Sequence, residues 1–279
     1  FGTATASYKD WLFLDITARN DWSSSLAFTK SFKTGFFYPS VGVSAALNEA
    51  FNLGPTVDLF KVRASYSGVG NDLPGRITNP LGSVSSTGII SSNTTAPFGD
   101  LKPETSGSFE AGIDWRFFNN RLSFDVTYYH TNTKNQLFSL SAPTGSGYTR
   151  YYVNSGNIQN QGVEATIGFI PVETKDFVWR SSSNLSHNSN KVISLHDEIP
   201  EFSINRGENF GYELKLVEGG SYGDVYGRKF ARDDNGKLLL DESGLPYKAS
   251  TTLDYMGNTQ AKLHAGWNNT LQYRNISLS

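Results

Sequence analysis

The sequence has no cysteine, a single methionine, no long apolar run and a formal net charge of only −2. Without cysteine, neither a disulfide framework nor a thiolate metal site can form. No stretch approaches the roughly 18 consecutive apolar residues of a membrane-spanning helix, and the first residues do not resemble a signal peptide. The small net charge gives no electrostatic reason to expect nucleic acid as a partner.

Aromatic residues and glycine are abundant instead. Tyr, Phe and Trp make up 14% of the chain, and 27 of its 279 residues are glycine. Together with the scarcity of methionine, this composition favours strands over helices. The chain is also long enough to build a sizeable core. Composition alone would equally fit a soluble β-protein.

Strict alternation of apolar and polar residues is the clearest pattern. From Ser108 to Phe117, every odd position is apolar and every even position is polar or glycine. Successive side chains of a strand point to opposite faces, so this pattern predicts a strand with one apolar and one polar face. Asn119-Asn120 can adopt the positive φ of a tight turn, and the alternation resumes over residues 122–129. A β-hairpin is therefore predicted.

The same alternation recurs along the chain. It is found at residues 12–19, 40–47, 60–67, 163–169, 177–187 and 261–268, with a last strand beginning at Ile276. This gives roughly nine strands, most of them near the length of about 9–11 residues that crosses a bilayer at a tilt. The fold class predicted is all-β and antiparallel.

The connections between these strands alternate in length. Short ones are expected at residues 48–58, 119–120, 170–176 and 274–275, and long ones at residues 20–35, 69–104, 139–160 and 188–260. Up-and-down outer-membrane barrels alternate short periplasmic turns with long extracellular loops, whereas a Greek-key sandwich has no reason to do so. We therefore expect residues 1–279 to belong to a single transmembrane β-barrel domain, within which 188–260 is a long extracellular loop region.

Aromatic and charged residues fit this barrel. Aromatic residues near the short turns are expected to form a girdle at the periplasmic interface: Phe60, Trp115, Phe117, Phe177, Trp179 and Tyr273. Charged residues on the polar face would point into the lumen: Asp15, Arg19, Lys61, Arg63, Glu110, Asp114, Arg116, Asp125, Arg180 and Lys262. A soluble sandwich could bury the aromatics and solvate the charges, so the loop lengths decide between the two folds.

Several sequence blocks stand out beyond the alternation. They are Leu101-Lys102-Pro103-Glu104 followed by Phe109-Glu110-Ala111-Gly112-Ile113-Asp114, then Thr133-Lys134-Asn135-Gln136-Leu137, and then Asn154-Ser155-Gly156-Asn157-Ile158. In this order and at these separations, they resemble the barrel of TonB-dependent transporters of the SusC/RagA type. The resemblance covers nearly the whole chain.

The resemblance implies a plugged barrel of about 22 strands in the cell outer membrane. It further implies import of oligosaccharides or peptides together with a SusD-like surface lipoprotein, energised by the TonB complex through a plug region that this chain does not contain. Roughly nine strands cannot close a barrel, and open sheet edges are not tolerated in lipid. We therefore expect a partial barrel, part of a longer protein.

No catalytic or metal-binding motif is recognised. Glu110 and Asp114 are expected to form lumen ion pairs beside Arg116 rather than to act as an acid–base pair, and the four histidines have no metal-like spacing. Asp233-Asp234-Asn235-Gly236 fits an Asn-Gly turn better than a calcium loop. We expect no enzyme activity, no cofactor and no metal.

Aromatic residues in the long connections are the candidate ligand-binding groups: Phe98, Tyr148, Tyr151, Tyr152, Tyr222 and Tyr226. Such rings stack on sugars and also pack on peptides, so they do not identify the cargo. They could equally pack the loops together or contact a partner protein. Besides TonB-dependent import, the alternatives are a passive porin or anchor barrel and a soluble, β-rich glycan-binding protein.

Overall fold

The computed structural model describes the whole chain except residues 76, 79–80, 97–100, 196–200, 208–210 and 248–252. Phe98, one of the candidate ligand residues, therefore lies outside the described residues. The chain divides into two units, one made of Phe1–Ser189 with Leu263–Ser279 and the other of Asn190–Lys262. None of the helices in the described part of the chain is long and apolar enough to span a membrane.

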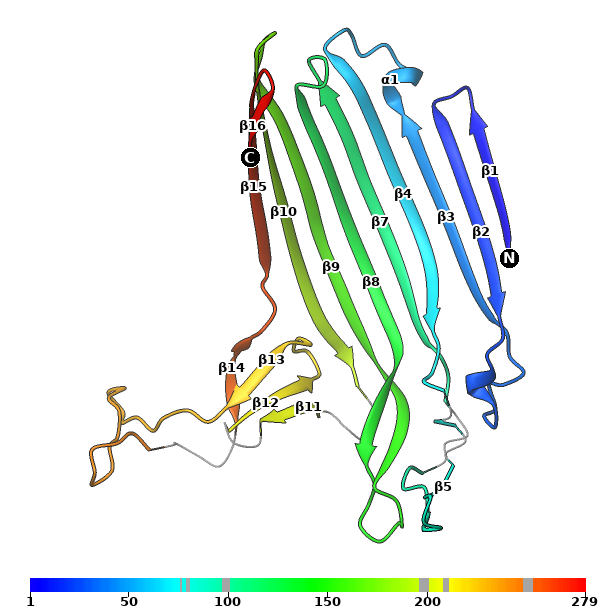
Figure 1. Ribbon diagram of the computed structural model, residues 1–279, viewed down its shortest axis with the longest axis vertical. Helices are drawn as coiled ribbons and strands as arrows, with labels where there is room; N and C mark the ends of the chain where they lie inside the picture. The colour runs from blue at the N-terminus through cyan, green and yellow to red at the C-terminus, as the bar shows by residue number, and fades with distance from the viewer. Residues whose placement is uncertain (76, 79–80, 97–100, 196–200, 208–210, 248–252) are drawn as a thin grey trace. The chain divides into compact units, whose positions relative to one another are not determined.

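The first unit is built on a ten-stranded sheet in which chain order is kept across the sheet. Neighbouring strands run antiparallel (Figure 1). In order, the strands are β1 (Gly2–Tyr8), β2 (Leu12–Asp21), β3 (Phe36–Ala46), β4 (Val57–Asn71), β7 (Glu104–Phe117), β8 (Leu122–Ser141), β9 (Arg150–Glu173), β10 (Phe177–Ser194), β15 (Leu263–Tyr273) and β16 (Ile276–Leu278). The predicted all-β, up-and-down antiparallel architecture is confirmed.

Several details of the predicted strands are wrong. The strand β10 runs to Ser194, into the connection expected at 188–260, and that connection itself contains four short strands. The sequence pattern missed β1, because its Gly, Thr, Ala and Ser side chains give little contrast between apolar and polar positions. The long connection expected at 139–160 is mostly strand, since β8 and β9 stay paired as far as Ser141 and Arg150, which leaves only residues 142–149 as the connection. The polar sequence of this hairpin resembled a loop, but cross-strand hydrogen bonds hold it as a ladder.

At one end of the strands, all the connections are short. The turn at Lys9-Asp10 has φ values of 48° and 57°, and Phe118, Asn119 and Asn120 have φ values of 57–60°, which confirms the tight turn expected at Asn119-Asn120. Residues 174–176 join β9 to β10, and the short helix α1 (Leu47–Ala50) lies between β3 and β4. The long connections lie at the opposite end of the strands. Residues 22–35 contain the 3₁₀ helix η1 (Ser24–Leu26), and residues 72–103 contain β5 (Ser83–Val84) and β6 (Ile90–Ser91).

The blocks around Asn135 and Asn154 meet in the β8–β9 hairpin. Asn135 and Gly156 stand opposite each other, between the pairs Lys134–Asn157 and Gln136–Ser155. Both have positive φ, 59° at Asn135 and 83° at Gly156, a conformation that Gly and Asn adopt most readily. Figure 1 shows β8 and β9 crossing over each other toward the strand ends that carry the long connections.

The second unit holds a four-stranded antiparallel sheet within residues 190–262. Its strands are β11 (Glu201–Gly207), β12 (Tyr212–Val217), β13 (Asp224–Gly227) and β14 (Asp254–Asn258). Leu216 is fully buried. Between β13 and β14, the backbone N–H of Asp233 donates to Lys237 O at 2.9 Å, and Gly236 has a φ of 80°, which confirms the Asn-Gly turn.

Candidate functional site

The large sheet has one apolar face. Residues directly opposite each other on neighbouring strands share a face, and the registers align two apolar rows across β4, β7, β8 and β9. These rows are Phe60–Trp115–Phe124–Ile167 and Val62–Ile113–Val126–Ala165. Near the short turns, the Trp115 ring stacks on Phe60 with a centroid distance of 4.8 Å. An exposed apolar face of this extent belongs against lipid.

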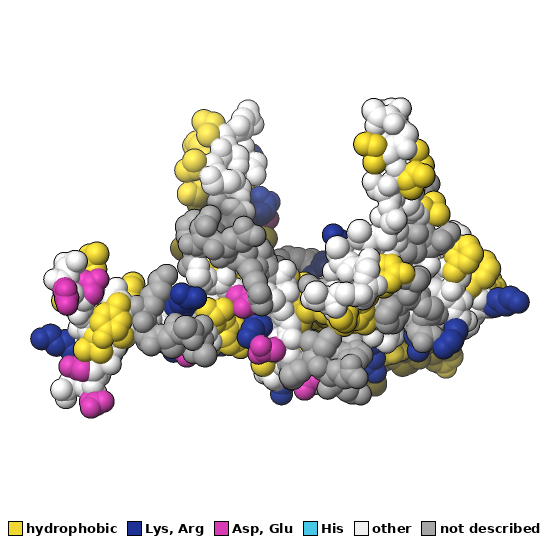
Figure 2. All heavy atoms as spheres, turned by 90° about the horizontal axis from the view of Figure 1, so that it is seen from below, with side chains coloured by type: hydrophobic (Ala, Val, Ile, Leu, Met, Phe, Trp, Pro, Cys, Tyr) yellow, Lys and Arg dark blue, Asp and Glu magenta, His cyan; other side chains and the backbone are white. Residues whose placement is uncertain are grey.

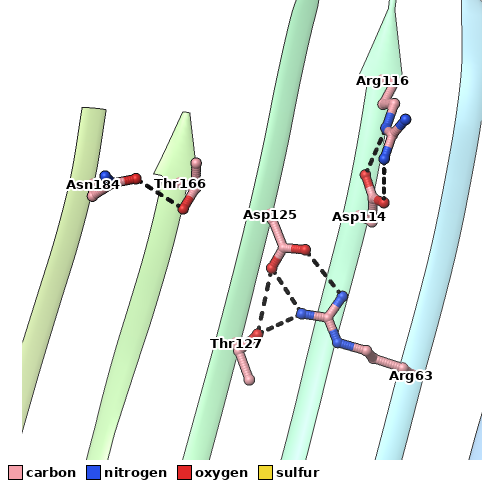
Figure 3. Close-up of polar contacts among 7 residues, drawn as sticks. All are labelled: Arg63, Asp114, Arg116, Asp125, Thr127, Thr166 and Asn184. Carbon is pink, nitrogen blue, oxygen red and sulfur yellow. Dashed lines mark hydrogen bonds and ion pairs between the residues drawn. The ribbon is translucent and has the colours of Figure 1, made fainter. Parts of the chain in front are cut away.

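The opposite face is polar and is cross-linked by charged side chains (Figure 3). Arg63 on β4 donates to both carboxylate oxygens of Asp125 on β8, at 2.7 and 3.2 Å, and to Thr127 Oγ1 at 2.6 Å. On β7, Arg116 donates to Asp114 at 3.1 and 3.2 Å. The predicted ion pairing of Asp114 with Arg116 is therefore confirmed, and a second pair, Arg63–Asp125, spans three strands.

Gly112 makes the longer pair possible. It lies on β7 between Arg63 on β4 and Thr127 on β8, directly opposite both. A Cβ atom on Gly112 would lie 2.9 Å from Cζ and Nε of Arg63. The guanidinium therefore crosses the middle strand over bare backbone, and a side chain at residue 112 would occupy its path.

A second side chain crosses a strand in the same way. Tyr129 on β8 passes over Gly162 on β9, where an added Cβ would lie 2.6 Å from the Tyr129 hydroxyl. That hydroxyl donates to Asn188 Oδ1 on β10 at 3.0 Å, and Asn188 donates to Asn160 Oδ1 at 3.3 Å. The two crossings share β8, so together they brace the polar face from β4 to β10.

Two open hollows lie on the polar face. The larger, about 480 Å³, is lined by side chains of β8, β9, β10 and β15, among them Asp125, Glu164 and His264. The smaller, about 240 Å³, includes Asp15, Lys61 and Glu110. Carboxylates, hydroxyls and amides can hold hydroxylated or cationic groups. Within the described residues, no cluster of His, Asp and Glu is placed to hold a metal ion.

A small core fixes the long connections beside the sheet. Leu26, Leu73 and Leu101 pack together, at 0%, 6% and 1% exposure. They come from residues 22–35 and from the two ends of residues 72–103. Tyr152 of β9 packs against this cluster. These connections are therefore folded onto the hairpin at their bases.

Asp72 ties the same connections together through hydrogen bonds. Its carboxylate accepts from the hydroxyls of Ser23 and Ser25, the latter at 2.5 Å, and from the Leu73 N–H at 2.8 Å. Burial acts to raise the pKa of Asp72, but these hydrogen bonds together lower the pKa below its usual value. The carboxylate is therefore held ionised.

Asn154 gives the resembling sequence blocks a structural role. Its side chain accepts from the Lys102 N–H at 2.6 Å and donates to Lys102 O at 2.7 Å and Asn135 O at 2.8 Å. One amide thus joins the block at 101–104, the block at 133–137 and its own block at 154–158. Neither spacing nor alternation could reveal this contact, because it depends on the bend at Asn135 and Gly156.

The candidate aromatic residues are distributed over both units. Tyr148 is exposed in the connection 142–149, Tyr151 lies in β9, and Tyr152 packs on the leucine cluster. In the second unit, Tyr222 is exposed and Tyr226 packs edge-to-face against Tyr255, with ring centroids 5.9 Å apart. Ligand binding by these residues stays a prediction.

Tyr226 is held in a charged environment. Lys215 Nζ lies 5.5 Å from its ring centroid, and Lys215 also pairs with Glu201 at 2.8 Å. Burial first, and then the nearby Asp224 carboxylate, raise the pKa of Tyr226. Its hydroxyl therefore stays protonated, able to donate a hydrogen bond, under ordinary conditions.

Charged and apolar side chains are exposed at the long-connection end. Figure 2 views the molecule from this end: basic side chains lie among apolar ones at the right, and basic and acidic side chains lie together on the segment at the left. Exposed aromatics on the long connections include Trp22 and Phe28.

Comparison with known sequences and structures identifies the family to which this sheet belongs. Residues 1–277 match the family described as "TonB dependent receptor-like, beta-barrel". TonB-dependent receptor P3 of Formosa agariphila is 27% identical, over 100% of this chain and 30% of its own length. TonB-dependent receptor SusC of Bacteroides thetaiotaomicron is 27% identical, over 64% of this chain and 19% of its own length. The chain thus spans about 30% or less of these relatives.

Solved structures agree on the fold. The RagAB peptide transporter superposes with a TM-score of 0.80 at 22% identity, over 99% of this chain and 32% of that one. The outer-membrane transporter YddB of Escherichia coli gives 0.54 at 10% identity, over 96% of this chain and 37% of that one. With its apolar outer face and polar inner face, the sheet is part of the wall of a cell outer-membrane barrel, and the chain belongs to the TonB-dependent receptor-like β-barrel family.

Proposed function

We propose that the whole protein imports a ligand across the outer membrane at the expense of TonB-supplied energy, and that this sheet is part of its barrel wall. The observation that carries the proposal is the two-faced sheet, apolar outside and braced inside by Arg63, Asp125 and Gly112, in a chain of this family. Residues 1–279 would belong to one barrel domain. Residues 188–260 would form an extracellular region, and the short turns would face the periplasm.

The cargo that we propose is an oligosaccharide or a peptide. SusC is the name of one relative, and RagAB is described as a peptide transporter, which supports these two classes without choosing between them. Exposed Tyr148 and Tyr222 are suited to stacking on sugar rings or packing on peptide side chains. We propose no catalytic step, since the Arg63–Asp125 and Arg116–Asp114 pairs hold the wall.

Energy dependence tests this function. Cells carrying the full-length protein should take up a labelled oligosaccharide mixture or a labelled peptide mixture, and uptake should fall to background when TonB is removed. The purified full-length protein should show no steady conductance in planar bilayers, because a plugged barrel conducts only when the plug moves. Uptake that persists without TonB, together with steady conductance, would instead establish a passive porin.

The partner that we propose is a SusD-like lipoprotein that contacts the region 188–260. This region has a folded sheet, and the segment between β13 and β14 extends from it. Gly227 and Asp254 are directly paired, so residues 228–253 can be replaced by Asn-Gly with β13 and β14 still joined as a hairpin.

The shortened full-length protein should still assemble, but it should retain several-fold less lipoprotein in affinity purification from detergent-solubilised outer membranes. Heat-modifiable gel mobility serves as the control for assembly. Undiminished co-purification with an assembled barrel would remove residues 228–253 from the interface.

A further inference from the structure

On the apolar face of the sheet, the rows of residues that lie nearest the long connections are polar. His130 on β8 lies directly opposite Phe109 on β7 and Gln161 on β9. In the next row, Asn132 lies opposite Gly107 and Gln159. Because opposite residues share a face, these polar groups continue the face that carries Ile113 and Trp115, and they do not point into the lumen.

These polar side chains form a cluster of their own. His130 Nε2 lies 2.9 Å from Asn132 Nδ2 and 3.2 Å from Gln159 Nε2. The imidazole and both amides each carry hydrogen-bonding groups besides the atoms in these contacts. The cluster offers both donors and acceptors in a small area.

An aromatic ring adjoins the cluster. The Tyr66 hydroxyl lies over Gly107, where an added Cβ would meet it at 2.9 Å, and Tyr66 is 48% exposed. Gly107 is directly opposite Asn132, so the Tyr66 hydroxyl and the Asn132 amide are separated by about one strand spacing, ~5 Å. An aromatic ring beside amides and an imidazole has the chemistry that binds sugar rings, with the ring face for C–H groups and the polar groups for hydroxyls.

The height of the cluster in the membrane follows from its distance to the apolar residues near the short turns. From Phe117 to Phe109, β7 advances about 27 Å along its axis. At the strand tilt of about 35–45° in outer-membrane barrels this is roughly 20 Å along the membrane normal, against an apolar band about 25 Å tall. The row of His130 therefore lies near the outer edge of the hydrocarbon, and the row of Asn132 lies one step further out. Lys134 follows in the next row, opposite Thr105 and Asn157.

We propose that Tyr66, His130, Asn132 and Gln159 bind the sugar headgroup of a glycolipid in the outer leaflet, on the lipid-facing side of the wall. The proposal goes beyond import, and it rests on the orientation given under the proposed function, with the long connections outside the cell. A phospholipid headgroup would be expected only where more basic side chains converge.

The experiment compares full-length variants purified in mild detergent by native mass spectrometry of the bound lipid. His130→Leu/Asn132→Leu and, separately, Tyr66→Leu are expected to retain about tenfold less glycolipid than the unaltered protein, because hydrogen bonds or the ring face are lost. Phospholipid should be unchanged. Thr131→Val is the matched control, since Thr131 lies between the two altered residues but on the lumen face, where it pairs with Ser108.

Two outcomes would overturn the proposal. Glycolipid retained in full by both variants would show that the cluster does not bind it, and equal loss of phospholipid would show a nonspecific lipid contact. Orientation is measured separately with Lys175→Cys and Asp234→Cys, both at exposed positions, labelled on intact cells by an impermeant maleimide. Labelling of position 234 alone supports the orientation, so unchanged glycolipid would then reject only the headgroup site. Labelling of position 175 alone would reject the orientation itself.

Discussion

Ile113→Arg is expected to abolish most barrel assembly in the full-length protein. Ile113 lies midway along the apolar face, between Val62 on β4 and Val126 on β8. An arginine near the middle of the bilayer destabilises a barrel by about 2–4 kcal/mol, and that is a large share of the stability of a typical folded protein. The measurement is the heat-modifiable fraction on gels of outer-membrane preparations.

Ser65→Arg is the matched control for this substitution. Ser65 is on the polar face of β4, directly opposite Glu110, so a new arginine there would meet a carboxylate and lumen water. We expect near-normal assembly. If both variants lost the assembled form equally, the two faces of the sheet would not be facing lipid and water.

Gly112→Val is expected to destabilise the wall by about 2 kcal/mol, the range for hydrogen bonds that involve charged groups. A side chain at 112 displaces the Arg63 guanidinium, whose Cζ would lie 2.9 Å from the new Cβ, and so breaks its contacts with Asp125. Arg63 and Asp125 remain 35% and 46% exposed, and this screening keeps the effect below that of a buried ion pair. The midpoint of urea unfolding of the full-length protein in detergent measures it.

Two further variants isolate the cause. Gly266→Val introduces the same side chain on the same face, where nothing lies within 4 Å of the added Cβ, and it should shift the midpoint little. In an Arg63→Ala background, Gly112→Val should lose most of its effect, because the two changes remove one interaction. A full, additive loss in that background would mean that Gly112 is needed for another reason.

The fold was largely predictable because the sheet has a period of two. Alternation in residues such as 108–117 predicts where a strand runs, which side chains share a face and where the turn follows. All three are local properties of the sequence. The weak strand β1 and the polar hairpin beyond Lys134 escaped for a physical reason: their side chains are small or polar on both faces, so pairing rather than pattern makes them strands.

The sequence predicted on which face each charged residue lies, but it did not predict which residues contact each other. Arg63 and Asp125 were both expected on the lumen face, yet their pairing depends on the register of the intervening β7 and on Gly112 lying between them. The clamp made by Asn154 depends on a bend in two strands. Tyr152 was expected to face ligand, and its packing on Leu26 and Leu101 could be found only once distant connections were seen to meet.

The strand-crossing side chains also bear on how the barrel finds its pairing. A slip of two residues between neighbouring strands leaves every apolar side chain on the lipid face, so the hydrophobic pattern alone cannot reject it. Such a slip of β7 would remove Gly112 from beneath Arg63, and a slip of β9 would remove Gly162 from beneath Tyr129. Each long side chain would then collide with a Cβ instead of crossing a gap. Gly112 and Gly162 therefore favour the observed alignments of β7 and β9 over a slip of two residues.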